Sequence, residues 1–106
     1  MPKRLPPQRM AEIVTSRRAI EDFKRIWRYI ALDDEAAADR LLLAIDAKIE
    51  RLRAFPEIGR PRDEIRPGAR TLVHGAYMVL YDYDRAKDVV EIIAVIEAMR
   101  DIGQLL

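Results

Sequence analysis

The 106-residue sequence predicts an α+β fold, a two-layer sandwich with elements in the order β-α-α-β-β-β. Two amphipathic helical patterns follow one another with only two or three residues between them, so the helices must fold back as an antiparallel hairpin. Three strand-like runs separated by short turns then complete the chain, which is typical of an antiparallel meander. We therefore expect the helical hairpin to pack on one face of a mostly antiparallel four-stranded sheet.

The first strand and the first helix are expected between residues 11 and 32. Residues 11–14 read Ala-Glu-Ile-Val, and Ser16 suits a helix N-cap because its hydroxyl can accept from the free first-turn amides. The helix is expected over 17–32, with Ile20, Phe23, Trp27 and Ile30 in one apolar stripe and Trp27 in the core. Residues 1–9, rich in proline and basic side chains, predict a flexible tail, which leaves 10–106 as a single domain.

The second helix is expected to begin after Asp33 or Asp34, either of which could cap it, and to continue to about Phe55. Its apolar positions recur with helical spacing at Leu42, Ile45, Ile49 and Leu52. Pro56 should end it, because proline lacks an amide proton and disfavours helix at the preceding residue. Residues 56–68 hold three prolines and two glycines, so they predict a loop.

The meander is expected over residues 71–73, 77–83 and 89–96, with turns at His74-Gly75 and at residues 84–88. Alternation places Tyr77, Tyr81 and Tyr83 on one face of the middle strand. Helices on one side would leave the other face of the sheet partly open and apolar. A patch of that kind on a small protein predicts an interface.

The composition excludes several classes of site. The sequence has no cysteine and one histidine, so disulfides, cysteine-ligated zinc and multi-histidine metal sites are excluded. A net charge of +1 argues against a dedicated nucleic-acid binder. No apolar run approaches the roughly 20 residues that span a membrane, and the first ten residues lack the apolar core of a secretory signal. We expect a cytoplasmic protein without catalytic residues, metal or cofactor.

One segment is markedly basic, because residues 51–75 carry six arginines against three carboxylates. The arginines are Arg51, Arg53, Arg60, Arg62, Arg66 and Arg70. Guanidinium groups suit bidentate contacts with carboxylates, so the cluster can be a docking surface for an acidic partner. Alternatively one or two of them, foremost Arg53 and Arg60, pair with nearby carboxylates and pin the loop. The sequence leaves both interpretations open.

Several motifs, in this order, resemble the ParE branch of the RelE/ParE toxins of bacterial toxin–antitoxin systems. The most specific is Leu52–Arg60, which reads LRAFPEIGR and matches the family pattern L-x-x-F-P-x-x-G-R. Residues 19–23 and 26–30 match the first-helix pattern, and 35–38 match the acidic, alanine-rich start of the second helix. Arg70-Thr71-Leu72, the Tyr77 to Tyr81 segment and Arg100-Asp101 match the later strands and the closing segment.

The resemblance implies a toxin that inhibits DNA gyrase by protein contact and is neutralised by a cognate antitoxin. It would form a hetero-oligomer with the antitoxin and would meet DNA only through it. The expected antitoxin- or target-binding residues are Arg60, Arg62, Arg70, Tyr77, Tyr81 and Arg100.

Two alternatives stay open. One is a ribosome-dependent mRNA endoribonuclease of the RelE kind, in which Arg70 would be the functional strand arginine. Glu97, which stands where relatives often have histidine, argues against it. The other is a non-toxic member that only binds its antitoxin.

Overall fold

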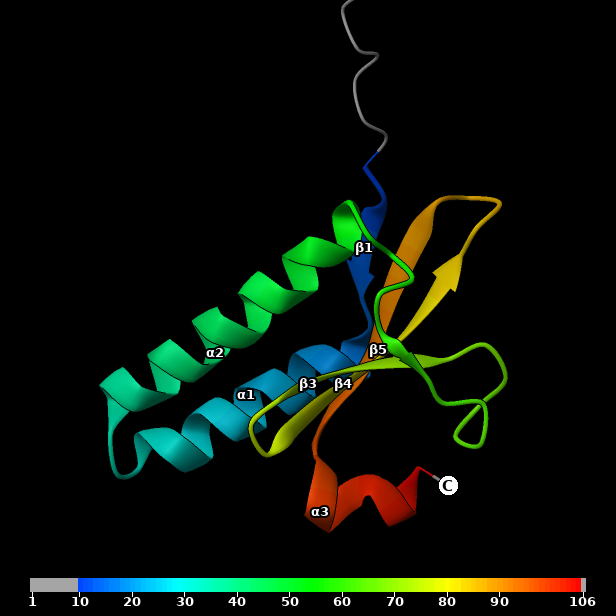
Figure 1. Ribbon diagram of the computed structural model, residues 1–106. Helices are drawn as coiled ribbons and strands as arrows, with labels where there is room; N and C mark the ends of the chain where they lie inside the picture. Colours follow the sequence, from blue (N-terminus) through cyan, green and yellow to red (C-terminus); the bar gives the residue numbers. More distant parts are fainter. Residues whose placement is uncertain (1–9, 106) are drawn as a thin grey trace, which may run out of the picture.

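The computed structural model describes residues 10–105, so the predicted tail over 1–9 lies outside the described residues. The predicted α+β order is confirmed, with one short additional strand and a short C-terminal helix (Figure 1). The elements are β1 (Glu12–Thr15), α1 (Arg17–Ala31), α2 (Glu35–Glu50), the 3₁₀ turn η1 (Arg51–Arg53), β2 (Arg60–Pro61), β3 (Arg70–His74), β4 (Tyr77–Asp84), β5 (Val89–Glu97), α3 (Ala98–Asp101) and the 3₁₀ turn η2 (Ile102–Gln104).

The sheet has five strands in the order β1-β5-β4-β3-β2, with β1 parallel to β5 and the other pairs antiparallel. Four strands were expected, and β2 is the additional fifth strand. In this strand Arg60 lies opposite Thr71, and Pro61 lies opposite Arg70. A two-residue strand that contains a proline shows no alternation in sequence, and it lies in the segment whose prolines and glycines predicted a loop.

The helical hairpin begins as the sequence predicts. The Ser16 hydroxyl accepts a hydrogen bond from the amide of Ala19 at 3.0 Å and donates one to the carbonyl of Ile93 in β5 at 2.8 Å. One side chain thus caps α1 and ties its first turn to the sheet. Asp34 caps α2, because its carboxylate accepts from the amide of Ala37 at 3.0 Å.

The second helix ends one turn earlier than predicted, since α2 stops at Glu50 and the chain continues as the 3₁₀ turn η1. The amide of Phe55 still donates to the carbonyl of Arg51 at 3.0 Å, so the backbone keeps a helix-like turn up to Pro56. Tightening of the last turn is common at helix ends and leaves no signature in the apolar spacing.

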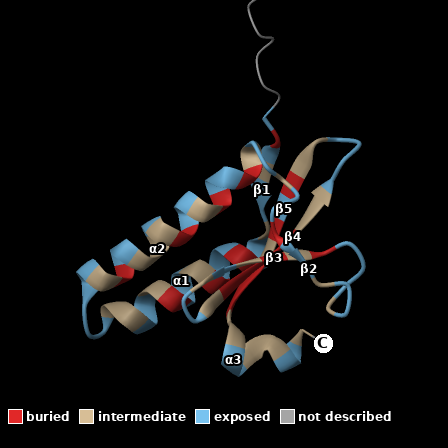
Figure 2. Cartoon of the chain, viewed as in Figure 1, coloured by how far each residue is buried: buried red, intermediate tan, exposed pale blue. Residues whose placement is uncertain are grey.

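The core lies where the hairpin meets β4 and β5 (Figure 2). The fully buried residues of α1 are Ala19, Asp22 and Ile26. Of the predicted stripe, Phe23 and Ile30 pack against the core as partly buried side chains. Ile20 is 44% exposed, and Trp27, expected in the core, is half-buried. Ala19 has almost no side chain to separate helix from sheet, so α1 packs on this smaller face.

Asp22 is 2% exposed and bonds directly to the sheet. Its carboxylate accepts from the amide of Val95 in β5 at 2.9 Å and pairs with Arg25 at 2.7 Å and Arg18 at 3.5 Å. The pairing of β1 with β5 ends at Ile92. Beyond that point β1 no longer covers this edge of β5, and the Asp22 carboxylate accepts the hydrogen bond that the amide of Val95 would otherwise lack.

The sheet face opposite the hairpin is not open, which corrects the expectation of an exposed apolar face. Leu80 and Ala94 are buried there beneath Ala69, Ile65 and Leu105. These covering residues come from the loop between β2 and β3 and from the C-terminal segment. Neither segment has an apolar periodicity that would predict this packing.

Candidate binding site

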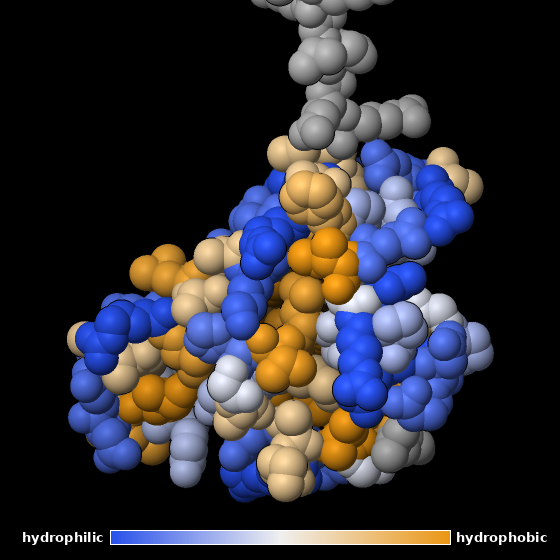
Figure 3. Space-filling model, viewed as in Figure 1, coloured by the Kyte–Doolittle hydropathy of each residue, from blue (hydrophilic) through white to orange (hydrophobic). Residues whose placement is uncertain are grey.

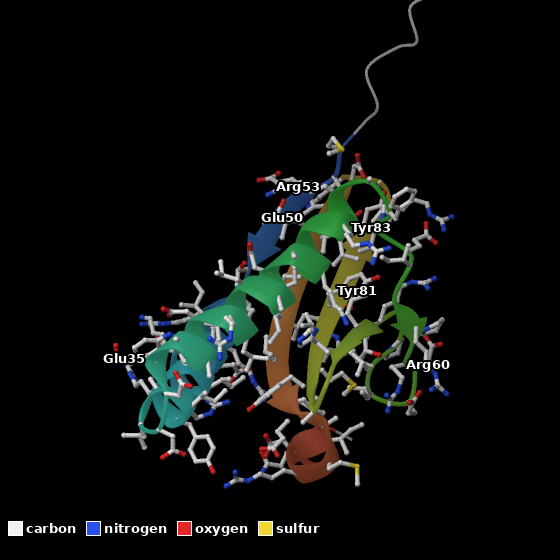
Figure 4. All side chains as sticks on the ribbon, turned by 60° about the vertical axis from the view of Figure 1, so that its left-hand side comes forward. Glu35, Glu50, Arg53, Arg60, Tyr81 and Tyr83 are labelled. Atoms are coloured by element: carbon white, nitrogen blue, oxygen red, sulfur yellow. The ribbon has the colours of Figure 1, made fainter. Side chains whose placement is uncertain are left out.

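The loop between η1 and β2 is held by Tyr81, the buried tyrosine of β4. Its hydroxyl donates to the carbonyl of Pro56 at 2.8 Å and accepts from the amide of Gly59 at 2.9 Å. Tyr81 is fully buried, and Figure 4 shows it on the central part of the sheet, away from the outer edge where Arg60 lies. Tyr81 was expected to contact the antitoxin or the target. In the structure it is buried beneath the loop and positions the loop through these two hydrogen bonds.

Burial raises the pKa of the Tyr81 hydroxyl above its ordinary value, and the hydrogen bond from Gly59 partly offsets this. A folded-state pKa above the unfolded value of about 10 means that this group's stabilisation is complete below pH 10 and is lost as the pH rises through the folded pKa. We expect the melting temperature to fall above pH 10, less steeply for Tyr81→Phe than for the wild type. Parallel thermal melts between pH 8 and 12 measure this, and identical slopes would contradict it.

Arg70 holds the same loop from β3. Its guanidinium donates to the carbonyls of Glu57 at 2.9 Å and Gly59 at 2.8 Å, and lies 3.6 Å from the Glu57 carboxylate. Glu57 also accepts from Arg85 at 2.8 Å. Arg70, predicted to contact a partner, is therefore engaged within the chain.

The interpretation in which arginines pair with nearby carboxylates and pin the loop is partly correct, because Arg53 pairs, Arg60 does not, and Arg70 is the arginine that holds the loop. Arg53 does pair, with Glu50 at 2.6 Å at the end of α2, and this hydrogen bond raises the pKa of Arg53 further (Figure 4). Arg62 bonds to Glu64 and lies against Met78. Arg60 is exposed at the outer edge of the sheet and makes no ion pair with the described residues 10–105.

Tyr77 and Arg100 come together at the other end of the sheet. They line a pocket of about 250 Å³ with Ile26 and Tyr29 of α1 and with Glu97. Burial, and then the negative charge of Glu97, raises the pKa of Tyr77. Arg100 is exposed and lies 3.8 Å from Glu97.

An apolar groove on the helical hairpin was not anticipated. It encloses about 360 Å³ and is lined by Ile20, Phe23, Lys24, Trp27, Arg28 and Leu42. Trp27 donates its indole N–H to Asp39 at 2.8 Å, which links α1 to α2 at the groove. The signal in the sequence was the apolar stripe that contains Ile20, Phe23 and Trp27, of which Trp27 was expected in the core. Apolar side chains reach the surface over the hairpin (Figure 3).

The predicted site residues thus form no common site. Arg70 and Tyr81 hold the loop between η1 and β2, and Arg62 pairs with Glu64 in the segment after β2. Arg60 remains available to a partner, and Tyr77 with Arg100 lines a separate pocket. Among residues 10–105, no three histidine, cysteine or acidic side chains gather as metal ligands. In that same part of the chain, no helix is long and apolar enough to cross a membrane.

A family model described as the ParE toxin of the type II toxin–antitoxin system, parDE, matches residues 13–102. The chain belongs to the ParE toxin family. The match extends from β1 to the C-terminal segment, so it includes the hairpin, the sheet and the fixed loop.

Similar proteins agree with this ParE assignment. Toxin ParE3 of Caulobacter vibrioides is 33% identical over 73 residues, which are 68% of this chain and 73% of the relative. A chain of the chromosomal ParDE system from P. aeruginosa has a TM-score of 0.69 at 20% identity and covers 84% of this chain and 97% of its own length. A chain of the RelBE2 toxin–antitoxin complex from Mycobacterium tuberculosis has a TM-score of 0.62 at 19% identity, covering 83% and 91%. At these identities the two structures establish the ParE/RelE fold alone.

Proposed function

We propose that this ParE-family toxin inhibits DNA gyrase through protein contact and is neutralised by direct binding of its antitoxin in the cytoplasm. The observation that carries the proposal is the family match over residues 13–102. The ribonuclease alternative would need Arg70 as a functional arginine, but its guanidinium is held by the carbonyls of Glu57 and Gly59. This engagement favours inhibition by binding over mRNA cleavage.

The apolar groove on the hairpin is the surface that suits the antitoxin. It runs between two antiparallel helices and presents Ile20, Phe23 and Trp27 at the spacing that an amphipathic helix can match. Lys24 and Arg28 border it, so acidic side chains beside the apolar face of the antitoxin segment would be favoured. Of the residues predicted from sequence, Arg100 keeps an exposed cationic group for an additional acidic contact with the antitoxin.

We expect Ile20→Glu to raise the antitoxin dissociation constant by well over tenfold, about 1.4 kcal/mol. The substitution places a carboxylate in an apolar groove that a bound helix would desolvate. Ile20 is 44% exposed, so the fold should tolerate it. Isothermal titration calorimetry measures the affinity. The matched control is Leu43→Glu on α2, a position that is 69% exposed and does not line the groove. Equal effects of the two substitutions would place the antitoxin elsewhere.

Expression in bacteria with and without the antitoxin tests the proposed function. The toxin alone should arrest growth and induce the DNA-damage response, as inhibition of gyrase would, and co-expression of the antitoxin should abolish both. Growth arrest without DNA damage but with cleaved mRNA would support the ribonuclease alternative. Harmless expression of folded protein would support a member that only binds its antitoxin.

A further inference from the structure

The loop between η1 and β2 exposes two large apolar side chains. Phe55 is 57% exposed and Ile58 is 46% exposed. Burial of a side chain of this size is strongly favourable, and in the chain alone much of the apolar surface of both residues stays in contact with water. The loop runs from the end of α2 to β2, and it exposes both side chains, unlike the groove on the hairpin (Figure 4).

The backbone of this loop is fixed at nearly every residue. The amide of Ile58 donates to the carbonyl of Phe55 at 3.2 Å. Tyr81 bonds the carbonyl of Pro56 and the amide of Gly59, and Arg70 bonds the carbonyls of Glu57 and Gly59. A surface that is ordered before binding loses little conformational entropy on association. The network therefore holds two exposed apolar side chains in a defined orientation.

The charge around the loop is basic. Arg51, Arg60 and Arg85 are exposed beside it, and the carboxylate of Glu57, within the loop, is already engaged by Arg70 and Arg85. A partner surface would need carboxylates around an apolar depression to complement this arrangement.

We propose that the Phe55–Arg60 loop is the surface that binds the folded target, with Phe55 and Ile58 entering an apolar pocket bordered by acidic side chains. The inference rests on the proposed function, since it names the toxin surface that gyrase would contact. Two apolar side chains exposed on a short fixed loop match a concave pocket on a folded protein, whereas an extended groove matches a helical segment. The antitoxin and the target would therefore use different surfaces of the toxin.

The test measures the binding of the full chain to immobilised gyrase and, separately, to the antitoxin. The double variant Phe55→Ala/Ile58→Ala should weaken gyrase binding by roughly tenfold or more, because truncation of central apolar anchors has effects of this size. Arg60→Glu should weaken it by a similar factor. Both variants should keep the antitoxin affinity within about threefold. Leu32→Ala, at a position that is 84% exposed at the end of α1, should change neither affinity.

The variant Tyr81→Phe tests the fixed orientation of the loop. It keeps every surface side chain and removes the two hydrogen bonds that the hydroxyl makes to the loop. Gyrase binding should weaken several-fold, through faster dissociation, while the antitoxin affinity stays unchanged.

The outcomes separate this inference from the proposed function. Unchanged gyrase affinity in the double variant, with antitoxin binding and melting temperature retained, overturns the loop as the target surface. A loss of antitoxin affinity equal to the loss of gyrase affinity also overturns it, because the two partners would then share the surface. A wild-type protein that binds antitoxin but not gyrase overturns the proposed function and this inference with it.

Discussion

Replacement of Asp22 by alanine should lower the free energy of unfolding by about 3 kcal/mol. The substitution removes a charged hydrogen bond to the amide of Val95 and leaves that amide buried without a partner, which together account for a loss of this size. The pairs with Arg18 and Arg25 add little, because both arginine side chains are more than half exposed. For a chain of about this length, the melting temperature should fall by roughly 15 °C.

Asp22→Asn is the matched control. Asparagine keeps an oxygen that can accept from Val95 but loses the negative charge, so the loss should be only about 1 kcal/mol. Urea denaturation of the wild type and both variants measures the difference. Equal losses in the two variants would mean that the charge, not the hydrogen bond to β5, holds α1 on the sheet.

Replacement of Gly59 by valine should lower the free energy of unfolding by about 3 kcal/mol and release the loop. A Cβ atom at this position would lie 2.6 Å from the Tyr81 ring and hydroxyl and 2.9 Å from the carbonyl oxygen of Thr71. Neither neighbour can move easily, because Tyr81 is fully buried and Thr71 is part of β3. The backbone must shift instead, and the bond between Gly59 and Tyr81 is lost.

Gly103→Ala serves as the control, since a Cβ there meets no atom within 4 Å. Its stability should match that of the wild type in the same denaturation series. If Gly59→Val proved equally harmless, the close packing of the loop on Tyr81 could not be what fixes its path.

The features that could be predicted from the sequence are those that depend on apolar periodicity and on helix capping. The hairpin followed from two helical apolar patterns separated by a very short connection, and Ser16 was correctly assigned as the cap of α1. The alternation in β4 correctly placed Tyr77, Tyr81 and Tyr83 on one face, where all three pack against the same core. These features depend on residues close together in the chain.

The rotation of α1 was not predictable from the apolar pattern. The predicted stripe of Ile20 and Trp27 had the larger side chains, but the helix buries Ala19 and Asp22 instead. The apolar pattern does not reveal that a small residue such as Ala19 lets the helix approach the sheet closely. It also does not reveal that Asp22 is buried, because its hydrogen-bond partner, the amide of Val95, lies 73 residues away. The stripe was real, but much of it lines a surface groove.

The register of β5 also depends on distant residues. Leu80 pairs with Ala94 and Tyr81 pairs with Ile92, so Ile93 is an extra residue in the strand. Its carbonyl accepts from the Ser16 hydroxyl. A bulge of this kind changes which side chains face the hairpin. The continuous run of apolar residues in β5 does not indicate where the bulge lies.

The candidate site was predicted least well. The motif at Leu52–Arg60 drew attention to the loop, but the roles of single residues depend on its path. That path is set by Tyr81 and Arg70, which lie on the following strands. Arg70 and Tyr81, which were predicted to contact a partner, therefore hold the loop, while Phe55 and Ile58 are the large apolar side chains that the motif exposes.

A gyrase supercoiling assay with the purified toxin tests the central claim most directly. Increasing toxin should inhibit supercoiling in a dose-dependent manner, cleaved DNA should accumulate, and equimolar antitoxin should restore full activity. Folded toxin that binds its antitoxin but leaves supercoiling unchanged at every concentration would contradict the account.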